Sequence, residues 1–269
     1  MSIDMHVHTT ASDGADTPEQ VVRLAASTGL MGIAITDHDT FSGVEPAVAA
    51  GMDCGIEVIP GIELSAEEEG SNVHILGYLI DMTDSVFIGR ITEFRRQRRN
   101  RIEKMVNKLR ESGLNVDMGR VLGIAGNGSA GRPHLAEAMF EAGLVADRGE
   151  AFTKYIGKGC VAYVPRYKLT PVEAVDMIKQ AGGIPVLAHP GSGVAGQIIP
   201  KLIKAGLMGI EAGHPSHSYD LFRYYTEIGR KQNLIITGGS DYHGLERKKD
   251  QHLGMISTPD NILQIMHNA

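Results

Sequence analysis

Short β-like runs alternate along this chain with longer helical stretches, and this alternation is the feature that most constrains the fold. Several of the stretches carry helix start signals, such as Thr170-Pro171 ahead of an amphipathic segment. Such a pattern is typical of α/β proteins whose strands are mainly parallel. It predicts seven strands, at residues 3–8, 32–37, 57–64, 73–80, 184–188, 209–211 and 234–237, and helices at 17–28, 171–181, 220–232 and 261–267.

The stretch from about 86 to 158 interrupts this alternation. It is mainly helical in pattern and contains five arginines between Arg95 and Arg101. We therefore predict a main domain formed by 1–108 and 156–269 and a helical insertion at 109–155 that caps it. A charged helix is most often a solvated face, but an excess of one sign in an acidic protein also suits a phosphate-binding role.

Composition excludes several classes of function. The 269 residues include 32 Asp and Glu against 26 Lys and Arg, a formal net charge of −6. That charge disfavours duplex nucleic acid, which needs a basic surface that releases counterions, but it permits a small basic pocket for a phosphorylated ligand. No run approaches the ~20 apolar residues of a membrane helix, and no signal peptide is evident. With only Cys54 and Cys160 and no CxxC pair, we expect a cytoplasmic protein.

Polar side chains, mostly histidines and carboxylates, follow nearly every predicted strand. In parallel α/β folds the carboxyl ends of the strands form one face, where binding groups collect. Each residue alone has an ordinary interpretation as a core histidine, a turn residue or a cap, but packing does not explain so many together. These residues are His6, His8, Asp13, Asp37, His38, Asp39, Glu63, His74, His189, Glu211, Asp241 and His243.

The spacing of His6 and His8 places both imidazoles on the same side of a strand, since side chains alternate with a period of two. Asp241 and His243 repeat this spacing near the other end of the sequence. Carboxylates among imidazoles supply charge compensation and bridging oxygens for a site with more than one metal ion. We therefore predict a multinuclear metal centre, and we expect both cysteines to lie outside it.

At these residues the sequence resembles the PHP (polymerase and histidinol phosphatase) family. The resemblance covers nearly the whole chain, and it implies a distorted seven-stranded (β/α) barrel with a helical insertion and a trinuclear metal centre at the carboxyl ends of the strands. The motifs that carry it are Asp4-Met5-His6-Val7-His8-Thr9, Ser12-Asp13-Gly14, Thr36-Asp37-His38-Asp39-Thr40, Pro60-Gly61-Ile62-Glu63-Leu64-Ser65, His74-Ile75-Leu76-Gly77-Tyr78, Leu187-Ala188-His189-Pro190 and Gly239-Ser240-Asp241-Tyr242-His243.

The resemblance also implies which residues bind the metal ions. Asp13-Gly14 stands where some family members have a histidine, and this resembles the subgroup of nucleotide phosphatases and 5′-to-3′ exoribonucleases. No implied ligand is missing, which disfavours a non-catalytic binding or regulatory module. The implied ligands are His6, His8, Asp13, His38, Glu63, His74, His189, Asp241 and His243.

In that subgroup the helical insertion supplies substrate contacts, which implies phosphate-binding roles for residues of this insertion. For Arg132 the ordinary interpretation is an exposed arginine at a helix start. His217 matches a further subgroup block, and we expect it, or a metal-bound water, to protonate the leaving oxygen; the alternative is a structural histidine. The residues expected to bind substrate are Arg99, Asn100, Arg101, Arg132 and His134.

We expect a phosphoesterase that cleaves the 3′-phosphate of a nucleoside 3′,5′-bisphosphate, or the 5′-terminal linkage of short RNA, by attack of a metal-held hydroxide. Three divalent ions, Mn, Fe or Zn, would activate the water and neutralise the ester, with Glu63 as the bridging carboxylate. The expected partner is a small phosphorylated nucleotide or short single-stranded RNA. We expect no binding to duplex nucleic acid or to membrane, and no obligate protein partner. The alternatives are a histidinol-phosphate-type or other small-molecule phosphatase, and a metal-dependent amidohydrolase, which usually bridges with lysine.

Overall fold

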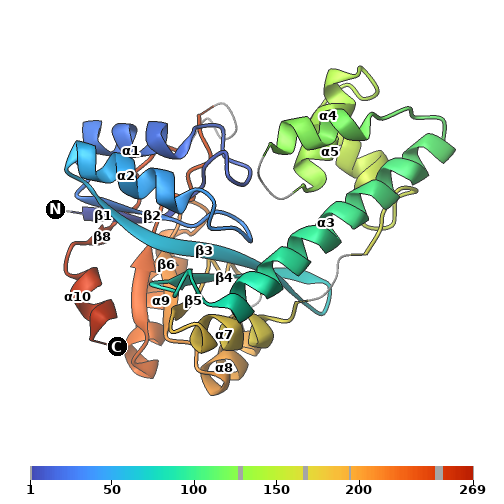
Figure 1. The fold of residues 1–269 in the computed structure, drawn as a ribbon. Helices are drawn as coiled ribbons and strands as arrows, with labels where there is room; N and C mark the ends of the chain where they lie inside the picture. The colour runs from blue at the N-terminus through green and yellow to red at the C-terminus, as the bar shows by residue number, and fades with distance from the viewer. Residues whose placement is uncertain (1, 127–129, 166–168, 194, 246–250, 269) are drawn as a thin grey trace. The chain divides into compact units, whose positions relative to one another are not determined.

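The computed structural model describes residues 2–126, 130–165, 169–193, 195–245 and 251–268. It divides into two compact units (Figure 1). Unit 1 comprises Met1–Ile88 and Lys168–Ala269, and unit 2 comprises Gly89–Tyr167. The range 109–155, expected from the sequence to form an insertion, lies entirely within unit 2.

Within the described residues, unit 1 contains one sheet of eight strands, in the order β7-β6-β5-β4-β3-β2-β1-β8. Each of the seven strands expected from the sequence is present, and the short β8 is additional because two residues carry no readable pattern. The strands are β1 (Ser2–Val7), β2 (Gly32–Ile35), β3 (Glu57–Glu68), β4 (Ser71–Tyr78), β5 (Ile184–Leu187), β6 (Gly209–Gly213), β7 (Ile235–Gly238) and β8 (Thr258–Pro259).

The sheet is less parallel than the sequence pattern suggested. β4 runs antiparallel to both β3 and β5, whereas β1–β2–β3 and β5–β6–β7 are parallel. The reason lies in the two-residue turn between β3 and β4, where Glu69 (φ 48°) and Gly70 (φ 84°) both have positive φ, as tight hairpin turns require. A parallel pair would instead need a long crossover connection.

The two ends of the sheet approach one another, so that the sheet forms a nearly closed, distorted barrel. Val7 at the end of β1 forms a bridge with Tyr242, which follows β7. The His8 N–H then donates to the Tyr242 carbonyl at 2.9 Å. The closure brings the carboxyl ends of β1 and β7 together, and with them the residues that follow each strand.

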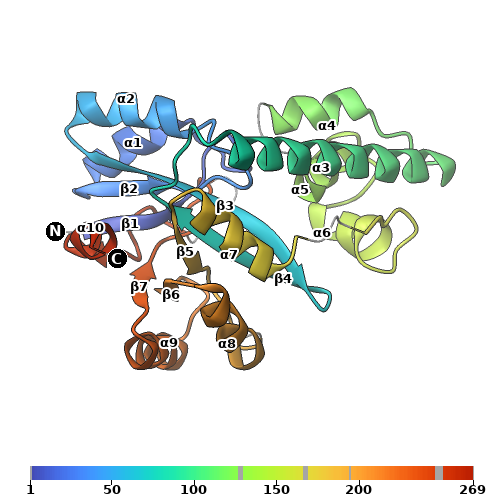
Figure 2. The same ribbon diagram turned by 60° about the horizontal axis from the view of Figure 1, so that its bottom comes forward.

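Helices cover the outside of this sheet: α1 and α2 lie over β1 to β3, and α7, α8 and α9 lie beside β4 to β7 (Figure 2). Thr17 and Thr170 each begin a helix with a capping box, in which the threonine hydroxyl and the side chain three residues later satisfy backbone N–H groups. The helices of unit 1 are α1 (Pro18–Ser27), α2 (Val44–Cys54), α7 (Pro171–Gln180), α8 (Ala195–Ala205), α9 (Tyr219–Gln232) and α10 (Ile262–His267).

A bulge in β1 determines which way its histidines point. The register between β1 and β2 shifts between Asp4 and Val7. Ile3 and Met5 belong to the core cluster of the sheet interior, whereas Val7 packs with the cluster beneath α1 and α2. Because neighbouring side chains on a strand point to opposite faces, the histidines on either side of Val7 face away from α1 and α2. Bulges commonly redirect side chains beside active sites.

Unit 2 is helical and has a core of its own. Ile102, Met105 and Leu109 of its longest helix pack with Leu135 and Met139 in one buried cluster. No helix in the described part of the chain is long and apolar enough to cross a membrane. The helical segments are α3 (Ser85–Glu111), which begins at the end of unit 1, α4 (Met118–Ala125), α5 (Arg132–Glu141), α6 (Arg148–Glu150) and a π-helical turn, η1 (Ala151–Ile156).

Candidate metal centre

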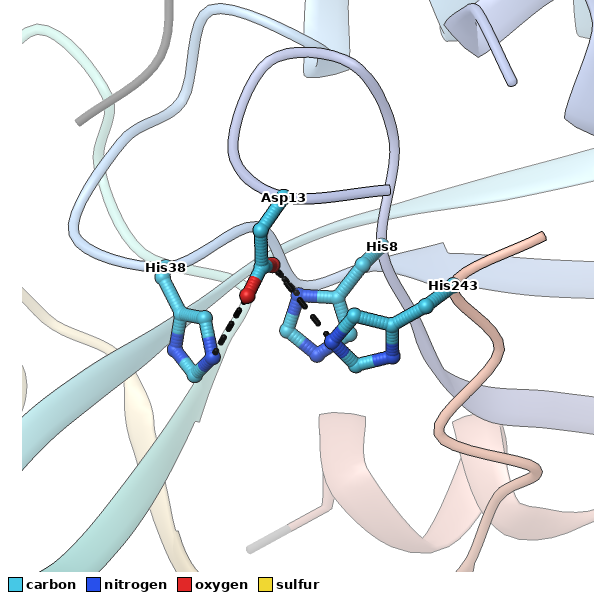
Figure 3. Close-up of side chains that lie close together, drawn as sticks. All are labelled: His8, Asp13, His38 and His243. Carbon is cyan, nitrogen blue, oxygen red and sulfur yellow. Dashed lines mark ion pairs between the residues drawn. The ribbon is translucent and has the colours of Figure 1, made fainter. Parts of the chain in front are cut away.

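The nine residues implied as metal ligands come from six strands of unit 1 or from the loops that follow them, and the fold brings all nine together. Their ligand atoms form four groups, and within each group the atoms lie within 4.8 Å of one another. Figure 3 shows the group formed around Asp13. The groups are His8, Asp13, His38 and His243; His6, His8 and Asp241; His6, Glu63 and His189; and His38, Glu63 and His74.

Glu63 is the carboxylate that links these groups. Its Oε1 lies 2.8 Å from His74 Nδ1 and 3.0 Å from His189 Nε2. Its Oε2 lies 2.9 Å from His38 Nδ1 and 3.3 Å from His8 Nε2. The two oxygens therefore face different imidazoles, which is the arrangement of a bridging carboxylate.

Two aspartates complete the carboxylate set. Asp241 Oδ1 lies 3.3 Å from His8 Nε2, and Asp241 Oδ2 lies 3.5 Å from His214 Nε2. Asp13 Oδ1 lies 3.4 Å from His243 Nε2, and its Oδ2 lies 3.9 Å from His38 Nε2 (Figure 3). His8 therefore lies close to all three carboxylates, because its Nδ1 is also 3.8 Å from Asp13 Oδ1.

The donor set fits divalent transition metals on two observations. Two tetrahedral ligands with bonds of ~2.1 Å lie about 3.4 Å apart, and many of the distances above are close to this value. In addition, Glu63 Oε2 and Asp13 Oδ1 are buried, yet within the described residues neither accepts a hydrogen bond of normal geometry. Buried carboxylate oxygens need a partner, and a cation among these imidazoles would supply one.

The three carboxylates and one imidazole have protonation states that suit metal binding. Burial alone would raise the pKa of Glu63, but neighbouring imidazoles, His38 first among them, hold it well below its ordinary value. Imidazoles likewise outweigh burial at Asp13 and Asp241, whose pKa values are also well below the usual range. Burial lowers the pKa of His74. The carboxylates are therefore ionised at neutral pH, and His74 is neutral, which are the forms that bind metal. Neighbouring carboxylates outweigh burial and raise the pKa of His6, His8 and His189, so these imidazoles would release protons when metal binds.

Glu211, on β6, orients two of the ligand histidines. Oε1 of this fully buried carboxylate lies 3.0 Å from His6 Nδ1, and its Oε2 accepts a hydrogen bond of 2.8 Å from the backbone N–H of His189. With Nδ1 engaged, the Nε2 of His6 faces the centre, 3.1 Å from His8 Nε2. Such partners fix ring orientation in metal sites. Sequence analysis noted Glu211 at a strand end but did not assign it this role.

Asp37 holds the loop that carries Asp13. Its Oδ1 accepts the Thr9 N–H at 2.8 Å and the Ser12 hydroxyl at 2.5 Å, and its Oδ2 accepts the Thr9 hydroxyl at 2.7 Å. Gly14 closes the loop, because a Cβ there would lie 2.7 Å from the His8 carbonyl oxygen. This close approach explains why glycine follows Asp13.

Backbone strain accompanies the site. His189 (φ 23°) and Asp241 (φ 49°) both lie in the left-handed region, where residues other than glycine are uncommon. Strained residues of this kind persist where the surrounding structure determines their conformation, and they concentrate at functional sites.

Comparisons with known proteins agree with this geometry. A PHP-domain model matches residues 4–114. The chain is 33% identical to a phosphoribosyl 1,2-cyclic phosphate 1,2-diphosphodiesterase of Eggerthella lenta, over 90% of this chain and 94% of that protein. It is also 33% identical to a 3′,5′-nucleoside bisphosphate phosphatase of Chromobacterium violaceum, over 90% and 87% of the two chains. This chain belongs to the PHP family.

A third relative of this PHP protein is the 5′-3′ exoribonuclease Rnm of Escherichia coli, 33% identical over 89% of this chain and 84% of the relative. Among solved structures, a metal-dependent phosphoesterase from Bifidobacterium adolescentis superposes with a TM-score of 0.89 at 30% identity, covering 98% of this chain and 94% of that one. A Chromobacterium violaceum protein described as an amidohydrolase, with bound sulfate and no metal, has a TM-score of 0.86 at 29% identity, covering 100% and 96%.

The PHP protein described here is therefore a metal-dependent hydrolase that acts on phosphate esters. The expected fold, family and enzyme class are confirmed. The roles of individual residues, and the number and identity of the metal ions, stay predictions.

His217 lies at the edge of the PHP centre rather than within the four ligand groups. Its Nδ1–H donates to the Ala212 carbonyl at 2.8 Å, and its Nε2 accepts the Gly191 N–H at 3.3 Å. Burial lowers its pKa. His214, whose ring centroid is 5.6 Å from that of His217, lies between it and the centre and contacts Asp241. Sequence analysis did not assign a role to His214, although it lies in the same block.

The residues expected to bind substrate all belong to unit 2. Arg132 opens α5 with its guanidinium 5.6 Å from the Phe152 ring centroid. His134 is buried, and its Nδ1 accepts the Gly131 N–H at 3.1 Å, which caps α5. On α3, Arg99 pairs with Glu103, Asn100 is exposed, and Arg101 donates to the Val164 carbonyl.

Proposed function

We propose that this PHP enzyme removes the 3′-phosphate of a nucleoside 3′,5′-bisphosphate, or cleaves the 5′-terminal linkage of short single-stranded RNA. The observation that carries the proposal is the arrangement of nine nitrogen and oxygen ligands around Glu63, in a chain that matches a bisphosphate phosphatase and an exoribonuclease over most of its length. A structural relative with bound sulfate supports oxyanion binding by this fold.

We propose three ions, manganese, iron or zinc. Nine ligands exceed what one ion needs, and the two oxygens of Glu63 face different imidazoles. His6, His8, His38 and Glu63 each belong to two of the four groups, so neighbouring ions would share ligands. When bound, the ions would supply positive charge to the phosphoryl oxygens and lower the pKa of a water molecule towards neutrality.

The protein's own residues would orient these ligands and move one proton. Glu211 holds His6, and Asp37 holds the loop of Asp13. His217 is the proposed proton donor to the leaving oxygen, and Nε2 is its exchangeable position because Nδ1–H is bonded to the Ala212 carbonyl. Because its lowered pKa keeps His217 mainly neutral at neutral pH, with Nε2 accepting the Gly191 N–H, the residue would first take up a proton at Nε2 and then pass it to the leaving oxygen.

The second phosphate distinguishes this substrate from a simple phosphate monoester. We propose that Arg132 binds it through charge-assisted hydrogen bonds, together with His134, Arg99, Asn100 and Arg101. A phosphate held away from the reacting one would contribute binding energy that positions the scissile ester. A small phosphate monoester such as histidinol phosphate lacks that second group.

Steady-state kinetics test the proposed substrate. After manganese reconstitution, we expect kcat/KM for adenosine 3′,5′-bisphosphate and for 5′-phosphorylated short RNA to exceed kcat/KM for histidinol phosphate by roughly 10- to 100-fold, because one charge-assisted contact contributes on the order of 1.5–3 kcal/mol. An amide substrate serves as the control for amidohydrolase activity. Equal or better turnover of histidinol phosphate would contradict the two-phosphate proposal.

A cyclic phosphodiester is the second candidate substrate. The Eggerthella lenta relative, which matches across nearly its whole length, is named for hydrolysis of phosphoribosyl 1,2-cyclic phosphate. Including that compound in the same kinetic series separates the two candidates. If its kcat/KM is the highest of the set, the cyclic ester is the substrate and the bisphosphate proposal fails.

Replacing Arg132 by alanine tests the phosphate contact. Loss of a charge-assisted hydrogen bond of about 1.5–3 kcal/mol predicts a decrease in kcat/KM for the bisphosphate of roughly 10- to 100-fold. Metal content should stay unchanged, because arginine is not a ligand. Arg120→Ala is the matched control, since Arg120 is an exposed arginine of unit 2 paired with Glu141. If both variants retain wild-type kinetics, Arg132 is an ordinary surface residue.

A further inference from the structure

Charge is distributed very unevenly between the two units. Unit 2 contains 15 Lys and Arg residues and 8 Asp and Glu residues, a formal charge of +7. The remaining sequence, unit 1, contains 11 and 24, a formal charge of −13. The acidic balance of the whole chain therefore conceals a basic unit. Such asymmetry within one chain suggests an anionic partner for the basic part.

The positive excess of unit 2 is concentrated on α3. This helix of 27 residues carries nine Lys and Arg against three Glu. Elsewhere in unit 2, acidic and basic side chains pair with each other: Arg120 with Glu141, Arg148 with Glu137, and Lys154 with Glu150. Because the nine cations of α3 exceed its three glutamates by six, most of the positive excess of unit 2 lies on this helix.

Three of these cations form a stripe along one side of α3. Arg101, Lys104 and Lys108 are spaced by three and four residues, so they lie on the same side of the helix. The stripe borders the buried side, which contains Ile102 and Met105. Glu103, the one acidic residue in the sequence from 100 to 110, pairs with Arg99 and points to the opposite flank.

Neutral groups position the stripe. Arg101 Nε donates to the Val164 carbonyl at 2.7 Å, and Lys108 Nζ donates to the Tyr163 carbonyl at 3.1 Å. A carbonyl oxygen has no net charge, so these two contacts position the side chains without placing a carboxylate beside them. The Arg101 guanidinium also lies 5.9 Å from the centroid of the Tyr163 ring. The stripe thus combines two positioned cations and the exposed Lys104 with an aromatic ring, and cations beside aromatic rings are a combination that single-stranded nucleic acid binds.

We propose that the stripe of Arg101, Lys104 and Lys108 binds the phosphate backbone of single-stranded RNA, so that the enzyme prefers an RNA chain to a free nucleoside bisphosphate. This inference rests on the proposed function and specifies its substrate class. From Arg101 to Lys108 the stripe extends over about 10 Å of helix, so its three cations suit successive phosphates of one strand rather than a single phosphate. The charge of −13 on unit 1 disfavours more extended anionic surfaces, such as duplexes or acidic membranes.

The double variant Lys104→Ala/Lys108→Ala tests the stripe, because neither side chain belongs to the proposed bisphosphate site. We expect its kcat/KM for a 5′-phosphorylated 15-nucleotide RNA to be about tenfold lower at moderate salt. The slope of log kcat/KM against log salt concentration should become shallower by about 1.4, since each lost phosphate contact on a single strand contributes ~0.7. Turnover of adenosine 3′,5′-bisphosphate should remain within about twofold of wild type.

Arg120→Ala controls for the loss of charge on unit 2 in general, and thermal unfolding confirms that the variants fold. The stripe proposal is overturned if the double variant changes RNA turnover no more than Arg120→Ala, or if bisphosphate turnover falls in parallel. If the wild-type enzyme hydrolyses neither substrate, the proposed function fails. In that case, fluorescence anisotropy of the labelled RNA with the same proteins tests the stripe proposal independently of catalysis. Equal affinity of wild type and double variant refutes the proposal, and weaker binding by the double variant supports it.

Discussion

Glu63→Gln is expected to lower kcat/KM for the preferred phosphate ester by about 1000-fold or more, equivalent to on the order of 4 kcal/mol in transition-state free energy. Glu63 is fully buried, and its two oxygens face different imidazoles at 2.8–3.5 Å. An amide replaces one of these oxygens by an N–H donor and removes the negative charge. The variant therefore loses both the bridge between neighbouring groups and the charge that a pair of cations requires.

Elemental analysis and circular dichroism complete this experiment. Metal content per chain should fall in Glu63→Gln, whereas the far-ultraviolet spectrum should match wild type because the barrel core does not depend on this side chain. Glu57→Gln is the matched control, since it makes the same chemical change at an exposed position of the same strand. Full metal content together with wild-type kinetics in Glu63→Gln would refute a bridging role.

Seven of the eight strands described in this barrel could be predicted because each contains a short apolar run. Their direction could not be read from the same pattern, since period and length do not distinguish parallel from antiparallel pairing. The informative signal was the turn at Glu69 and Gly70, whose two positive φ angles force β4 to return alongside β3. α2 and α8 were not predicted, because α2 starts without a side-chain cap and Pro200 interrupts the pattern of α8.

HxH spacing and strand-end position drew attention to the candidate ligands, and the family resemblance implied the set of nine. The fold brings these nine residues together, and their role as ligands stays a prediction. The residues that orient the ligands were not assigned, because their partners are distant in the chain: Glu211 contacts His6, 205 residues away. Asp37 similarly reaches back across 25 residues to Ser12. Both were visible as polar residues after strands, but only the fold shows which group each one holds.

The arginine-rich segment was identified from its composition, but the contacts of its side chains could not be predicted. Its sequence indicates positive charge but not how each cation is used. In the structure, Arg96 and Arg99 are paired with glutamates of their own helix, whereas Arg101 donates to a backbone carbonyl. His134 was identified from its motif, and the fold adds a bond that caps α5. The partner of each arginine depends on the direction in which its side chain points along the helix, and the number of arginines in the sequence does not give that direction.

Removing the metal ions should lower the melting temperature by about 10 °C or more. One ion present at 1,000 times its dissociation constant stabilises the native state by about 4 kcal/mol, and 1 kcal/mol shifts the melting temperature of a domain of this size by roughly 2–4 °C. Protein purified without chelator should contain close to three transition-metal ions per chain. Differential scanning calorimetry before and after EDTA treatment, followed by manganese addition, measures the shift and its reversal.

Hydrogen exchange locates this effect. The four candidate ligand groups found among the described residues all lie in unit 1. Without ions, the ionised carboxylates of Asp13 and Asp241 depend on protonated imidazoles alone for compensation, so the loops that carry them should open more often. Amides that close these loops, such as His8 N–H to Tyr242 and Ala15 N–H to His243, should lose protection.

The Leu135 and Ala142 amides of α5 provide the control, because they lie in the separate core of unit 2. Equal loss of protection in both units, or a melting temperature that EDTA leaves unchanged after full reconstitution, would contradict a structural contribution from metal binding at this centre.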